Sequence, residues 1–162
     1  MLKTKFLIKN ALIAALYAAL TLGLAPFSYG FLQVRISEFM TMLAFHNRNF
    51  IPGLVLGCFL SNIGSPFGLT DIIIGTLATF LAVTAMQFCP NAFLASLMPV
   101  LFNGVIVGWE LAYLAALPPG MPVAVAMLYI GFGEFLSVSV LGLAIVKLLH
   151  KNTLVQGYLD KW

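Results

Sequence analysis

The chain has 162 residues, of which 62% are hydrophobic and only 8% are charged, and its mean hydropathy is +1.05. Soluble domains carry roughly a quarter of charged residues, so this composition excludes a soluble protein and indicates one that lies in lipid. The net charge of +3 does not indicate nucleic-acid binding, because the basic residues lie at the ends of apolar segments rather than in one patch.

Proline and glycine residues divide the chain into six apolar segments, the second of which is short for a full crossing of ~20 residues. The first has a basic start like a secretory signal, but further apolar segments follow it and we expect it to be retained. We predict an all-α integral membrane protein, a single domain over residues 1–162 built as a bundle of six transmembrane helices. The segments are Lys9 to Ala25, Ile36 to Phe45, Pro52 to Asn62, Thr70 to Phe88, Ala92 to Leu117 and Pro122 to Leu149.

The positions of Lys and Arg predict the orientation, because cytoplasmic loops are enriched in both residues. With six crossings and both termini cytoplasmic, Arg35 alone lies on the outer side. The other basic residues are then all inside: Lys3, Lys5, Lys9, Arg48, Lys147, Lys151 and Lys161. This distribution predicts a multi-pass protein of the cell membrane.

Four of the five acidic residues fall in the outer half of this arrangement, namely Glu38, Asp71, Glu110 and Glu134. Together with Arg35 they carry a formal charge of −3. Ionisable side chains in a membrane are expensive and are functional by default. The cluster therefore predicts a binding site for a polar small molecule, cationic or rich in donors, that enters from outside.

A polar stripe follows the fifth segment, where Asn103, Ile106, Glu110 and Tyr113 recur at helical spacing with Trp109 beside them. Such a face suits a planar ligand that is held by hydrogen bonds and stacked on a ring. The alternative for Trp109 and Tyr113 is an aromatic belt at the membrane interface. Glu110 lies too deep for a belt residue, which favours a role in binding.

Each remaining charged candidate has a structural alternative. Glu134 lies between small residues that allow a ligand to approach, but it also suits a buried, protonated carboxyl group bonded to a neighbouring helix. Asp71 precedes a small-residue stripe and could cap the start of its helix. Arg35 and Glu38 are three residues apart and could pair only with each other.

Small residues line the first segment at four-residue spacing and allow another helix to approach closely in lipid. This helix belongs either to the bundle or to a second membrane protein. The residues are Ala11, Ala14, Ala15, Ala18 and Ala19.

The chain lacks the motifs of an enzyme or an ATPase. There is no GxxxxGK[ST] phosphate loop, no G-x-S-x-G elbow and no H-E-x-x-H pair. Cys58 and Cys89 lie in apolar segments without paired spacing, and His46 and His150 are far apart. We therefore expect neither a metal site nor a disulfide, and no cofactor.

Two blocks of sequence carry a family resemblance. They are QVRISE, from Gln33 to Glu38, and the block from Gly57 through Asn62, Gly68 and Asp71 to Gly75. With the alanine-rich first helix, they make the chain resemble the substrate-binding S components of energy-coupling-factor (ECF) vitamin transporters, and among these the QueT family. The similarity covers nearly the whole chain.

The resemblance implies a binding subunit for a queuosine precursor, a 7-deazaguanine such as queuine or its aminomethyl precursor. It also implies a separate transmembrane coupling protein and two ATPases, with the five alanines of the first helix contacting the coupling protein. Two of the four outer acids would bind the ligand, with Gln33, Asn62 and Asn103 on the remaining base edge and Trp109 or Tyr113 stacking. Arg35 belongs to the same predicted site.

Two alternatives remain open at this point. One is an S component for a different vitamin. The other is a proton-coupled exporter of lipophilic cations, in which a deep Glu134 exchanges protons for the transported cation. Against the exporter, the acids gather at the outer side, whereas alternating-access carriers keep their site near the midplane.

Overall fold

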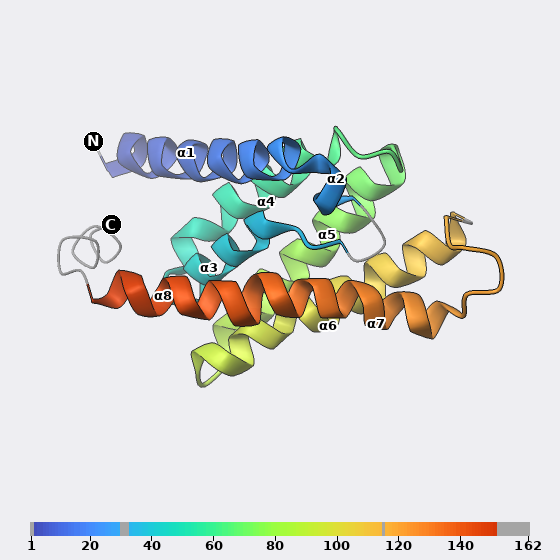
Figure 1. Cartoon of the computed structure of the whole chain (residues 1–162). Helices are drawn as coiled ribbons and strands as arrows, with labels where there is room; N and C mark the ends of the chain where they lie inside the picture. The colour runs from blue at the N-terminus through green and yellow to red at the C-terminus, as the bar shows by residue number, and fades with distance from the viewer. Residues whose placement is uncertain (1, 30–32, 115, 152–162) are drawn as a thin grey trace.

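The computed structural model describes residues 2–29, 33–114 and 116–151, and all regular structure within these ranges is helical. Figure 1 shows long helices packed side by side, with the start of α1 and the end of α8 at the same end of the molecule. The elements are α1 (Leu2–Gly23), α2 (Ala25–Ser28), η1 (Ile36–Thr41), α3 (Met42–His46), η2 (Arg48–Phe50), α4 (Ile51–Asn62), α5 (Leu69–Ala85), η3 (Met86–Phe88), α6 (Ala92–Tyr113), α7 (Val123–Glu134), η4 (Phe135–Gly142) and α8 (Leu143–His150).

Four helical stretches in the described ranges are long and apolar enough to cross a membrane: Lys3–Gly23, Leu69–Phe88, Ala92–Tyr113 and Val123–Leu148. The predicted second and third segments are shorter. The 12 residues of α4 extend about 18 Å, which is less than the thickness of the hydrocarbon core. The integral membrane character is thus confirmed, while the count of six crossings and the cytoplasmic termini stay predictions.

The segment predicted as the second helix is not one regular helix. It consists of the 3-10 helix η1 followed by the single short α-helix α3. Ser37, Glu38 and Thr41 in η1 are fully buried, and η1 packs against both α1 and η4 (Figure 1). This polar stretch therefore passes through the interior of the molecule instead of facing lipid.

Small residues allow close contact between α1 and α4. A Cβ added at Gly57 would lie 3.1 Å from the Cα atom of Ala14 and 2.8 Å from the Tyr17 Cβ. The side chain of Asn10 ties the same helices together: its Oδ1 accepts from the Gly53 N–H at 2.6 Å, and its Nδ2 donates to the Asn49 carbonyl at 3.0 Å. The first helix is thereby fixed to the bundle along one face.

The predicted sixth helix is continuous but changes its hydrogen-bonding pattern in the middle. After α7 the chain forms the π-helical segment η4 and then continues as α8. Short π-helical segments inside α-helices are frequent at functional sites. Here the segment begins directly after Glu134 and packs against η1.

Candidate functional site

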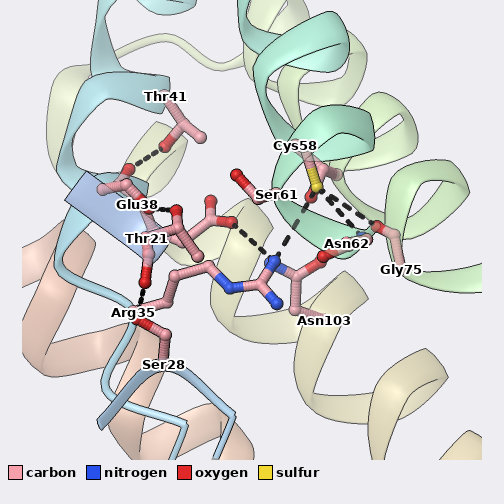
Figure 2. A network of polar contacts seen from close by, with 12 residues as sticks. Thr21, Ser28, Arg35, Glu38, Thr41, Cys58, Ser61, Asn62, Gly75 and Asn103 are labelled. Carbon is pink, nitrogen blue, oxygen red and sulfur yellow. Dashed lines mark hydrogen bonds and ion pairs between the residues drawn. The ribbon is translucent and has the colours of Figure 1, made fainter. Parts of the chain in front are cut away.

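The conformation of the chain at Gln33 is unusual. Its φ angle is +37°, in the left-handed region that residues other than glycine rarely adopt, and its side chain is buried. Non-glycine residues held in this region cluster at functional sites. The turn leads directly into Arg35, whose side chain Figure 2 shows extending toward α4.

Arg35 is a buried cation with weak partners. Its Nη1 lies 4.0 Å from Glu38 Oε1 and 3.8 Å from Cys58 Sγ, and its guanidinium lies 5.5 Å from the centre of the Tyr29 ring. Burial raises the pKa of the Tyr29 hydroxyl, with Arg35 opposing that rise, and the hydroxyl donates to the Ser61 carbonyl at 2.6 Å. The predicted pairing of Arg35 with Glu38 is present, although the contact is long.

The carboxyl group of Glu38 is hydrogen-bonded to a side chain of α1. The Tyr17 hydroxyl donates a hydrogen bond to Glu38 Oε1, and both side chains are fully buried. Alongside, the hydroxyls of Thr21 and Ser37 lie 2.6 Å apart. Two side chains of α1 therefore contact η1 from the face that packs into the bundle.

Asn62 and Asp71 meet where α4 approaches α5. Asn62 Nδ2 donates to the backbone carbonyl of Asp71 at 3.0 Å, and a Cβ added at Gly75 would lie 2.6 Å from Asp71 Oδ1. The helix α5 begins at Leu69 with Gly68, at φ +67°, as its cap. Asp71 is thus in the first turn and is not the capping residue, so that alternative is wrong.

The third side of the site comes from α6 and α7. Asn103 Nδ2 donates to Glu134 Oε1 at 3.0 Å, which confirms that Glu134 is bonded to a neighbouring helix. Glu110 lies about two turns further along α6 and is 1% exposed. Arg35 interacts electrostatically with both carboxyl groups, and Asp71 interacts with Glu110.

Many polar atoms of this cluster are buried without a hydrogen-bond partner in the part of the chain that the structure describes. Seven of the predicted site residues contribute one such atom each, and Glu110 contributes both of its carboxyl oxygens. Unpaired buried polar groups are rare in proteins because each costs the free energy of its lost hydration. The atoms are Gln33 Nε2, Arg35 Nε, Glu38 Oε2, Asn62 Oδ1, Asp71 Oδ2, Asn103 Oδ1, Glu110 Oε1 and Oε2, and Glu134 Oε2.

The two aromatic residues predicted to stack on the ligand lie elsewhere. Trp109 is 51% exposed and Tyr113 is 73% exposed, and their rings stack on each other with centres 5.5 Å apart. Trp109 is rotated by about 100° from Glu110 around the helix axis, whereas Tyr113 is rotated by only about 60° and lies in the last turn of α6. This position favours the aromatic-belt alternative.

The alanines of α1 divide between two faces. Ala14 is buried against α4, whereas Ala11, Ala15 and Ala19 are exposed and Ala18 is half-buried. Only part of the predicted stripe is therefore free to contact another protein, because Ala14 serves packing inside the bundle.

Sequence reasoning missed Tyr17, and it treated Cys58 only as a core residue. Cys58 and Cys89 are both free, and Cys58 lies in the cluster, where Asn62 Nδ2 donates to its sulfur at 3.6 Å. Ser137 in η4 also carries a buried hydroxyl without a partner among the described residues. None of the three is charged, so no local pattern distinguishes them from ordinary helix residues.

A groove on the outside of the molecule has a different character from the buried polar cluster. An open groove of about 880 Å³ between α6 and α7 is lined by apolar residues such as Leu101, Val105 and Leu128. Its lining offers no groups for a polar ligand, and it lies on membrane-spanning helices. No group of three or more His, Cys, Asp or Glu that could hold a metal ion occurs within residues 2–29, 33–114 and 116–151.

Comparison with known proteins decides the family. The model of the QueT transporter family matches residues 7–151. The chain belongs to the QueT transporter family. It is also 40% identical over 90 residues to the queuosine precursor transporter QueT of Lactococcus lactis subsp. cremoris (strain MG1363), a match that covers 53% of this chain and 53% of that protein. No solved structure matches the chain.

QueT is a family of transporters, which confirms the expected family and the expectation that the chain is not an enzyme. Membership together with the four apolar spans confirms a multi-pass membrane protein. The chain spans about half the length of the curated relative that it matches.

Proposed function

We propose that the chain is the membrane-embedded substrate-binding subunit of an ECF-type importer and captures a queuosine precursor from outside. The observation that carries this proposal is the buried cluster of incompletely paired polar atoms around Arg35 and Glu110. A ligand with several donors and acceptors would satisfy those atoms. The printed name of the Lactococcus lactis relative supports a queuosine precursor as that ligand.

The chemistry of a 7-deazaguanine fits Glu110. The base presents a ring N–H and an exocyclic amine side by side, and one carboxylate accepts both. Both oxygens of Glu110 lack a partner among the described residues, so this side chain is the best placed for that edge. Hydrogen bonds to a charged acceptor are about twice as strong as neutral ones.

A positively charged aminomethyl arm would take a second carboxylate. Asp71 interacts electrostatically with Glu110 and has one oxygen without a partner in the described ranges. Glu134 also retains one oxygen, but its other oxygen accepts from Asn103. We assign the arm to Asp71 and the remaining base edge to Asn62, Gln33 and Asn103.

Uptake against a gradient needs an energy source, and the chain has no phosphate loop. The proposal supplies it through a separate coupling protein with two ATPases, which is the arrangement implied by the family resemblance. The exposed alanines Ala11, Ala15 and Ala19 on α1 offer a surface on which a helix of the coupling protein can pack closely.

Calorimetry with the purified chain in detergent tests the substrate. The panel holds queuine, the cyano and aminomethyl 7-deazaguanines, guanine, riboflavin and a lipophilic cation. Tight binding of a 7-deazaguanine but not of guanine supports the proposal. Binding of riboflavin or of the cation, with none of the 7-deazaguanines bound, contradicts it and favours another vitamin or an exporter.

Copurification with the coupling module tests the partner. Ala15→Leu places a large side chain on the exposed face of α1 and should abolish copurification while ligand affinity stays unchanged. Val105→Leu enlarges an exposed residue on α6 and serves as the matched control. If both variants copurify like the unmodified chain, the α1 face is not the docking surface.

A further inference from the structure

Arg35 is the one buried Lys or Arg in the part of the chain that the structure describes. A guanidinium carries five N–H donors and no acceptor. Its contact with Glu38 is 4.0 Å long, Cys58 offers only a weak sulfur acceptor at 3.8 Å, and Nε has no partner among the described residues. Strong donors of a largely buried side chain therefore remain unused.

The surroundings of Arg35 decide which acceptor it takes. Glu38, Glu110 and Asp71 all interact electrostatically with the guanidinium. An anionic ligand group would be repelled by these carboxylates, whereas a neutral carbonyl oxygen would not. In a 7-deazaguanine the ring carbonyl is adjacent to the N–H edge assigned to Glu110, so one planar ligand can contact both side chains.

The guanidinium is held in place from α1. Tyr17 donates to Glu38 Oε1, and the same oxygen is the one that faces Arg35 Nη1. Tyr17 is fully buried and lies on the opposite side of α1 from the exposed Ala15 and Ala19. Glu38 Oε1 thus contacts both Tyr17 of α1 and the guanidinium of Arg35, and Figure 2 shows the second of these contacts.

We propose that Arg35 donates to a carbonyl oxygen of the ligand, and that Tyr17, acting through Glu38, is the positioning residue that directs the guanidinium toward it. This inference rests on the proposed function and deepens it. It makes Glu38 a support for Arg35 rather than one of the carboxylates that bind the ligand. It also makes the recognition of the ring carbonyl depend on a side chain of α1.

The test compares two ligands that differ in one atom. The probes are 7-aminomethyl-7-deazaguanine and its 6-thio analogue, which keeps the ring N–H and the amine but replaces the carbonyl oxygen by a weakly accepting sulfur. Calorimetry should show the unmodified chain binding the oxo ligand about tenfold more tightly or better, as expected for a hydrogen bond to a charged donor. Arg35→Lys should remove this preference.

Tyr17→Phe should lower the affinity for the oxo ligand about fivefold to tenfold and change that for the thio ligand less than twofold. Tyr113→Phe, at an exposed tyrosine, is the matched control and should change neither. Glu38→Gln provides a second variant with the same expected loss of preference if Tyr17→Phe does not fold.

The outcomes separate the role of Tyr17, the role of Arg35 and the proposed function. Equal losses for the two ligands in Tyr17→Phe, or an unchanged preference, overturn the positioning role of Tyr17. An unchanged preference in Arg35→Lys overturns carbonyl recognition by Arg35. Failure of the unmodified chain to bind the oxo ligand overturns the proposed function, and the inference with it.

Discussion

Two polar clusters connect α1 to the rest of the molecule, one around Asn10 and one around Arg35. At Asn10 both side-chain groups are paired: Oδ1 accepts from Gly53, and Nδ2 donates to the carbonyls of Phe6 and Asn49. Around Arg35 most side chains keep at least one buried polar atom without a partner in the described ranges. A network whose polar groups are all paired stabilises the packing, whereas a network with unpaired groups can form hydrogen bonds to a ligand. Four substitutions test this distinction.

The largest effect is expected at Glu110. Glu110→Gln replaces one carboxylate oxygen by an amide NH2 group, which is itself a donor and faces the donors of the ligand. Loss of two charge-assisted hydrogen bonds should lower affinity by about 100-fold or more. Calorimetry with the aminomethyl 7-deazaguanine measures this loss, with Val105→Leu on the exposed face of the same helix as the control. Unchanged affinity would remove Glu110 from the site.

Asn10→Ala should act on stability instead of binding. It removes three hydrogen bonds and leaves the Gly53 N–H unpaired, at a cost of about 1–3 kcal/mol. Thermal unfolding in detergent should show a lower midpoint, while the folded fraction binds ligand as before. A loss of affinity comparable to that of Glu110→Gln would contradict the separation of the two clusters.

Gly75→Ala probes the packing between α4 and α5. The added Cβ would lie 2.6 Å from Asp71 Oδ1 and 2.9 Å from Asn62 Nδ2, so both side chains must move. We expect about a tenfold loss of affinity, corresponding to ~1.4 kcal/mol. Gly23→Ala is the control, because its Cβ meets nothing within 4 Å among the described residues. Similar affinities of the two variants would place Asp71 and Asn62 outside the site.

The smallest effect is expected at the exposed aromatic pair. Trp109→Phe should change ligand affinity less than twofold, since the ring faces outward and stacks on Tyr113. Affinity is measured by calorimetry, because the substitution removes a tryptophan and would change the signal of a fluorescence titration. A tenfold loss would instead bring the ring into contact with the ligand and restore the stacking role that the sequence suggested.

Much of the candidate site was predictable because charge is conspicuous in an apolar chain. Arg35, Glu38, Asp71, Glu110 and Glu134 are all buried, as expected of functional intramembrane groups. Their relative roles were not predictable. Whether a carboxylate is already paired, as Glu38 is with Tyr17, depends on a residue 21 positions away in the chain.

Composition and hydropathy by themselves determined that this is an all-α membrane protein. The chain is 62% apolar and its apolar residues form long runs, and in lipid such runs form helices because every backbone polar group must be paired within the protein. The motifs from Gln33 to Glu38 and from Gly57 to Gly75 pointed to the family. Only the tertiary structure decided that Ala14 is buried while Ala15 is exposed, and that Trp109 lies outside the buried polar cluster. Sequence spacing places residues on a helix face, but which face meets a neighbour depends on how the helices pack against one another.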